Sequence, residues 1–81
     1  MSVTYYVALP FLKTEDGSAP GQAQECQNSG EAIRRAAAMA RDPLNEGALA
    51  FERTGEPSQG NFADAKIIKT FGLVPENLDE L

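Results

Sequence analysis

The sequence predicts an α+β fold: a small two-layer β-α-β-β sandwich in which one helix covers one face of a three-stranded mixed sheet. Three observations indicate this fold. Residues 3–12 carry larger apolar side chains at alternate positions, and residues 47–54 begin apolar and end charged between two turn signals, as strands do. An alanine-rich segment at 30–41 lies between them, and a second apolar segment, 65–72, follows a turn rich in Gly, Pro, Ser and Asn. Because 81 residues suffice for one small domain, residues 1–81 are interpreted as a single unit.

The first strand, residues 3–12, is predicted from alternating apolar residues on one face: Val3, Tyr5, Val7, Leu9 and Phe11. Tyr6 and Ala8 make its other face partly apolar too, so both faces require cover, one from the helix and the other from a loop or a second copy of the chain. Pro10 has no N–H to donate to a neighbour, which favours an edge strand or the fraying end of a strand.

The helix is predicted over residues 30–41, with Asn28 or Ser29 as its N-cap and Asp42-Pro43 as its end. Its apolar stripe would pack on the sheet. The stripe comprises Ile33, Ala37, Ala40 and Leu44, with Ala36 beside it.

Residues 47–54 and 65–72 are predicted as the second and third strands, although a helix over 61–71 also fits the spacing of Ala63, Ile67 and Phe71. A crossover helix would make the first two strands parallel, and the third would return antiparallel. We favour the sheet order 1-3-2 over the alternative 1-2-3. Regular alternation places Lys66 and Lys69 on opposite faces of the third strand.

Residues 13–28 carry several turn signals and are predicted as one long irregular loop. Residues 75–81 begin with proline and are predicted as a tail that forms a short helical turn.

The net charge of −5 disfavours binding to nucleic acid or to an anionic membrane surface. A single cysteine, Cys26, precludes an internal disulfide and favours a cytoplasmic location. With no histidine in the chain, no catalytic residue, metal site or cofactor is predicted.

Four side chains would decorate the sheet as cross-strand charge pairs: Glu52, Arg53, Lys66 and Lys69. The candidate binding residues among them are Glu52, Arg53 and Lys69, which would hold a small anion or a partner's carboxylate. Cys26 is the remaining candidate, because a helix N-terminus lowers the pKa of a nearby thiol. No base is present to activate it in the usual Cys-His manner.

Three stretches of the sequence resemble a group of short uncharacterised bacterial proteins, mainly proteobacterial: residues 47–57 (GALAFERTGEP), 60–65 (GNFADA) and 71–75 (FGLVP). Helix residues 29–39 fit the same pattern, and the resemblance covers roughly residues 15–78. It implies a bacterial cytosolic origin and brings no activity with it.

These observations favour a non-enzymatic protein-interaction or accessory module that associates through its sheet, with a second copy of the chain as one form of partner. One alternative is a sensor of small ligands or anions, with the 13–28 loop, Arg53 and Lys69 as contacts. The last is a thiol-dependent enzyme that uses Cys26.

Overall fold

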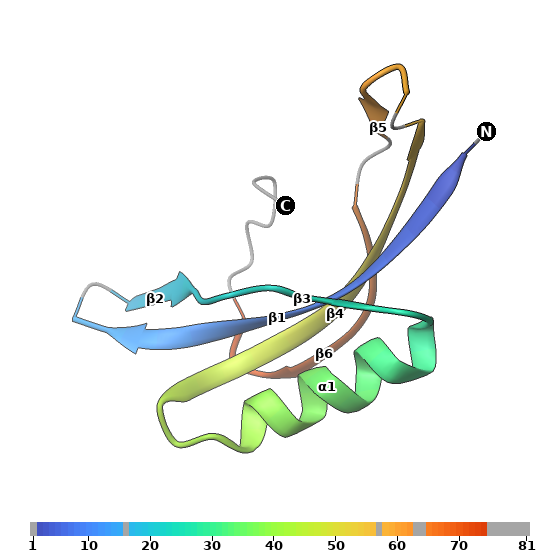
Figure 1. The fold of residues 1–81 in the computed structure, drawn as a ribbon. Coiled ribbons are helices and arrows are strands. Elements are labelled where there is room, and N and C mark those ends of the chain that lie inside the picture. Colours follow the sequence, from blue (N-terminus) through green and yellow to red (C-terminus); the bar gives the residue numbers. More distant parts are fainter. Residues whose placement is uncertain (1, 16, 57, 63–64, 75–81) are drawn as a thin grey trace.

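A computed structural model describes residues 2–15, 17–56, 58–62 and 65–74 (Figure 1). These ranges contain one helix and one sheet built from six strand segments, and each strand pairing is antiparallel. In chain order the elements are β1 (Val3–Thr14), β2 (Gly17–Pro20), β3 (Gln24–Cys26), α1 (Ser29–Arg41), β4 (Asn45–Glu56), β5 (Asn61–Phe62) and β6 (Lys66–Gly72).

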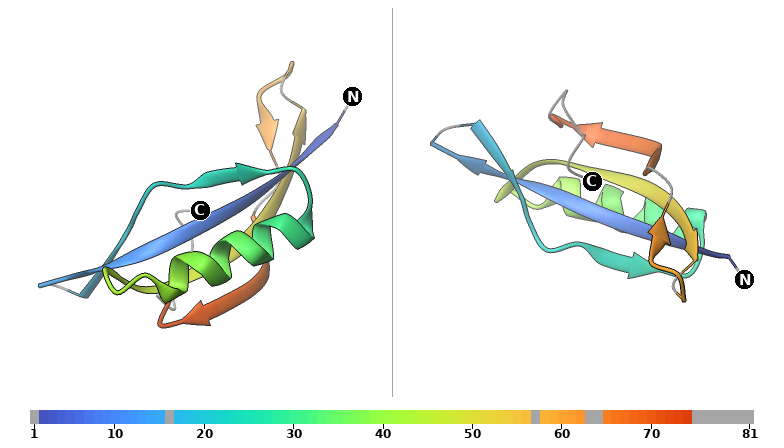
Figure 2. Two further views of the ribbon diagram at one scale, coloured as in Figure 1. Left: turned by 60° about the horizontal axis from the view of Figure 1, so that its bottom comes forward. Right: turned by 90° about the horizontal axis from the view of Figure 1, so that it is seen from above.

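Strands β1 and β4 form the centre of the sheet, paired from Val3↔Gly55 to Leu12↔Asn45. Both β2 and β3 pair with the free side of β1, and both β5 and β6 pair with the free side of β4. Figure 2 shows β2 and β3 along one margin of the sheet, β6 along the other, and α1 across one face.

The prediction of a three-stranded mixed sheet is wrong, and so is the prediction of an irregular loop over residues 13–28. That segment returns along β1 as β2 and β3 before the helix begins. Helix α1 therefore connects β3 with β4, and β1 runs antiparallel to β4 rather than parallel. The favoured order 1-3-2 is also wrong, because β4 lies between β1 and β6. The predicted helical turn at 75–81 lies outside the described residues.

Pro10 lies inside the sheet, so the prediction of an edge strand is wrong for β1. The Pro10 carbonyl accepts a hydrogen bond from the Gly21 N–H at 2.8 Å, so the proline nitrogen faces the β2–β3 side. At this point the outer strand is interrupted: β3 pairs as far as Ala8↔Gln24, and β2 begins at Phe11↔Pro20. The break removes the need for the N–H that proline lacks.

Helix α1 is capped at both ends by side chains. Asn28 is the N-cap, as predicted, and its Oδ1 accepts from the Glu31 N–H at 2.8 Å. At the other end, Asn45 Nδ2 donates to the Met39 carbonyl at 2.8 Å, and the Leu44 N–H donates to Asp42 Oδ1 at 2.9 Å. The Asn28 and Asn45 bonds satisfy backbone groups that a helix leaves open at its ends, and the Leu44 bond orders the turn that follows the helix.

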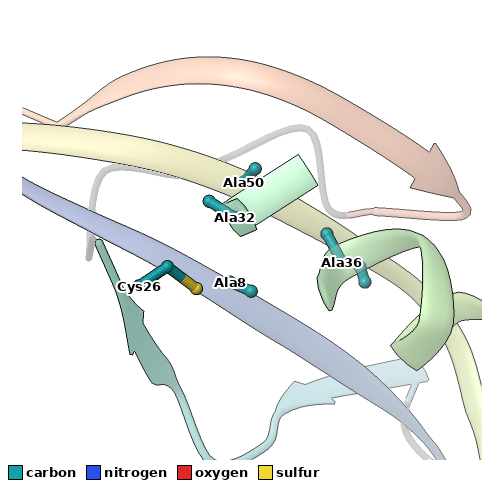
Figure 3. Close-up of a cluster of buried hydrophobic side chains, with 6 residues drawn as sticks. Ala8, Cys26, Ala32, Ala36 and Ala50 are labelled. Atoms are coloured by element: carbon teal, nitrogen blue, oxygen red, sulfur yellow. The ribbon is translucent and has the colours of Figure 1, made fainter. Parts of the chain in front are cut away.

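The helix packs on the sheet through small side chains, which form an alanine core (Figure 3). Its buried members are Ala8, Cys26, Ala32, Ala36, Ala48 and Ala50. Because the five alanines are completely inaccessible to solvent, the helix and sheet backbones lie close together. The predicted stripe is therefore rotated: Ala32 belongs to the contact, whereas Leu44 is 72% exposed.

The opposite face of the sheet carries a second apolar cluster, the leucine–phenylalanine core, formed by Leu9, Phe11, Leu49 and Phe51. Their exposed fractions are between 0 and 9% in the single chain. Val7, Ala65 and Val74 pack against them. Of the two kinds of cover expected for this face, a loop or a second copy of the chain, these four side chains do not need the second copy.

Two glycines allow β4 and β6 to approach closely at one end of their pairing. A Cβ atom on Gly47 would lie 2.7 Å from the Phe71 carbonyl oxygen, and one on Gly72 would lie 2.7 Å from the Glu46 carbonyl oxygen. Gly72 also has φ of +68°, a conformation that side chains disfavour. The sequence therefore needs glycine at both positions to keep β6 in register.

Candidate functional site

The two margins of the sheet differ in how well they could accept another strand. The margin formed by β2 and β3 consists of short segments interrupted at residues 21–23. The other margin is formed by β5 and β6, and within it β6 is a continuous strand of seven residues. Among the described residues, β6 pairs with β4 alone, so its outer side is the continuous open edge of the sheet.

The backbone direction of β6 can be worked out from its pairing with β4. The Phe71 carbonyl points at β4, where it approaches Gly47, and the Leu73 N–H donates to the Glu46 carbonyl at 3.0 Å. Because backbone groups alternate in direction along an antiparallel strand, the N–H and C=O of Thr70 point away from β4. Thr70 thus offers a donor and an acceptor at the open edge.

A bulge in β6 brings two lysines to the same face of the sheet. Lys69 pairs with Ala50 and Lys66 pairs with Glu52, with Ile68 as the extra residue between them. Ala50 and Glu52 are two residues apart on β4, so their side chains share the helix-covered face, and their partners share it too. Both lysines are exposed, and we call this pair the edge lysines.

The ammonium group of Lys69 lies 5.4 Å from the centroid of the Phe71 ring. This is within the range of a cation–π contact, which helps to orient the ammonium group. Phe71 itself packs against the alanine core, so its ring is a fixed partner for Lys69.

The structure does not bring the three predicted binding residues together. Glu52 pairs with Tyr6 on the helix-covered face, and Lys69 lies on that same face. Arg53 follows Glu52 along β4 and pairs with Tyr5, so its side chain belongs to the opposite face. A single anion site built from Arg53 and Lys69 is therefore not supported. Lys66, which was not among the predicted binding residues, is the residue that accompanies Lys69.

Cys26 lies in the alanine core with its thiol directed at the Gln24 carbonyl, 3.6 Å away. Burial, together with the Glu31 carboxylate, raises the pKa of the Cys26 thiol above its ordinary value. A raised pKa lowers the thiolate fraction at neutral pH, so this environment does not activate a nucleophile.

In the described part of the chain, no three His, Cys, Asp or Glu side chains gather closely enough to hold a metal ion. The helix in these ranges is too short and too polar to cross a membrane.

Comparison of the chain with models of protein families, with curated proteins and with solved structures finds no match.

Proposed function

We propose that the protein is a non-enzymatic interaction module that binds an extended segment of another protein along the outer side of β6. The observation that carries the proposal is the continuous open edge of β6, in contrast to the interrupted margin of β2 and β3. An extended segment that adds to such an edge gains main-chain hydrogen bonds, while its alternate side chains determine specificity.

The partner's backbone would pair with groups such as the N–H and C=O of Thr70. The tight contact of Gly47 with the backbone of Phe71 supports this mode, since it holds β6 against β4 and presents an ordered edge. An ordered edge lowers the entropic cost of binding, because the protein side of the new pairing is already formed.

The experiment is a selection of random linear peptides on the immobilised chain, followed by fluorescence anisotropy with the enriched sequences. Thr70→Pro places the proline ring at the open edge and leaves pairing with β4 intact, because the Thr70 N–H points outward. We expect this variant to lose peptide binding, while Thr70→Ala, which keeps the N–H, binds like the parent. Equal binding by the parent and Thr70→Pro would contradict the proposal, provided that circular dichroism shows both variants folded.

We further propose a reducing compartment, the bacterial cytoplasm, as the location. The buried free thiol of Cys26 supports it, since a sole cysteine gives the fold no disulfide to form internally. Fractionation of cells that express the protein at its native level would test this location.

A further inference from the structure

We infer that the β6 edge selects extended segments that carry carboxylates at alternate positions, a Glu-x-Glu pattern. This inference rests on the proposed function and names the class of partner. Its basis is the pair of edge lysines, Lys66 and Lys69, which the bulge at Ile68 places on the same face of the sheet.

The spacing of the edge lysines matches the repeat of an extended chain. Lys66 and Lys69 stand opposite Glu52 and Ala50, which are two residues apart on β4. Two residues of a strand span about 6.8 Å, and alternate side chains of an added strand would repeat at the same interval on the same face. Carboxylates at positions i and i+2 would therefore each meet one lysine.

The charges around the edge lysines make Lys69 more available than Lys66 to a carboxylate of the partner. Glu52 is the cross-strand neighbour of Lys66, so an incoming carboxylate shares Lys66 with it. Lys69 faces Ala50 on β4 and has the Phe71 ring nearby. On the helix, the Arg35 guanidinium donates to Gln24 on β3, which is at the other margin of the sheet.

The same geometry opposes pairing of β6 with the β6 strand of a second copy. Antiparallel pairing about a twofold axis would gather the edge lysines of both copies on one face. Like charges on neighbouring strands are destabilising, and edge lysines are a common protection against self-association. The edge lysines therefore favour a different, acidic chain over a second copy of this one.

The test uses three synthetic fluorescein-labelled decapeptides that alternate Thr with Glu, with Gln or with Lys. We expect the Glu peptide to bind about 2- to 30-fold more tightly than the Gln peptide, the range for two exposed ion pairs, and the Lys peptide to bind most weakly. Lys66→Glu/Lys69→Glu should reverse the order, so that the Lys peptide binds most tightly.

The control variant is Lys13→Glu/Arg34→Glu, which lowers the net charge by the same four units at exposed positions away from β6. It should keep the parent's preference. A reversal in this control as well, or equal binding of the three peptides to the parent, would overturn the inference.

Different results would refute the binding of extended segments at the β6 edge and the preference of that edge for carboxylates. If the three peptides bind alike and Thr70→Pro abolishes their binding, the edge function stands and the carboxylate preference is refuted. If Thr70→Pro leaves the binding of the Glu peptide unchanged, the edge is not the binding site and both proposals are refuted.

Discussion

A substitution at Leu49 tests whether the face of the sheet opposite α1 forms a hydrophobic core within the single chain. The Leu49 side chain is completely inaccessible to solvent and lies in the leucine–phenylalanine core beside Leu9, Phe11 and Phe51. Replacing it with alanine removes three buried carbon atoms and leaves a cavity on a face where the described residues place no helix that could move inward.

The expected loss of stability is large for a chain of this size. A fully buried Leu→Ala change costs about 3–5 kcal/mol, and 81 residues at the usual stability per residue give a total of about 4–12 kcal/mol. The Leu49→Ala variant should therefore lose between about a quarter and all of the parent's free energy of unfolding.

Leu44 provides a matched control, because the same substitution there removes a side chain that is 72% exposed. Leu44→Ala should change the free energy of unfolding by less than about 0.5 kcal/mol. Urea denaturation followed by circular dichroism measures both, and with an m-value of about 1 kcal/mol per molar urea, Leu49→Ala should lower the midpoint by about 3–5 M.

A comparable loss in both variants would refute this account, because it would place Leu44 in the core, as the helical pattern of the sequence suggested. The midpoint should also be the same at low and high protein concentration. A midpoint that rises with concentration would mean that association between copies contributes to the burial of this face.

Three further changes follow from other contacts. Gly72→Ala should destabilise the fold by about 2 kcal/mol or more in thermal unfolding, because the new Cβ atom meets the Glu46 carbonyl and φ is positive. Asn28→Ala should cost about 1 kcal/mol and Asn28→Asp much less, since aspartate keeps the oxygen that accepts from the N–H of Glu31. The raised pKa of Cys26 favours the protonated thiol in the folded state, so stability should be flat below the ordinary cysteine pKa and fall as pH rises past it. Cys26→Ala should flatten that fall, and an unchanged slope in this variant would refute the assignment.

The sequence carries enough information to place the helix and the two strands that follow the helix and pair with each other, β4 and β6. The prediction for 30–41 agrees with α1, because alanine has high helix propensity and Asn28 and Asp42 mark its ends. The strands predicted at 47–54 and 65–72 overlap β4 and β6, where apolar alternation is strong.

Residues 13–28 were mispredicted because the strand structure there does not come from local preference. Segments such as Gly-Ser-Ala-Pro in β2 and Gln-Glu-Cys in β3 are poor strand formers. They are extended because they pair with β1. This pairing joins segments that lie apart in the sequence, so a local sequence pattern does not predict it. Missing this return also reversed the predicted direction of β1 relative to β4.

The candidate site escaped prediction for a similar reason. In a regular strand a spacing of three residues puts Lys66 and Lys69 on opposite faces, and only the pairing with β4 reveals the extra residue at Ile68. For Leu44 the local pattern was misleading. Its spacing continues the apolar stripe of the helix, but the helix ends at Arg41 with Asp42 as its C-cap, so Leu44 is not part of the helix.

The alanine core has a consequence for the order in which parts of the native state open. Alanines bury little hydrocarbon area, so α1 gains less from docking than β1 and β4 gain from Leu9, Phe11, Leu49 and Phe51. Backbone amides of the helix should then exchange with deuterium sooner than those of the central strands, through partial opening that leaves the sheet intact. The sheet therefore has a hydrophobic core of its own, and the helix is attached to it through the close packing of small side chains.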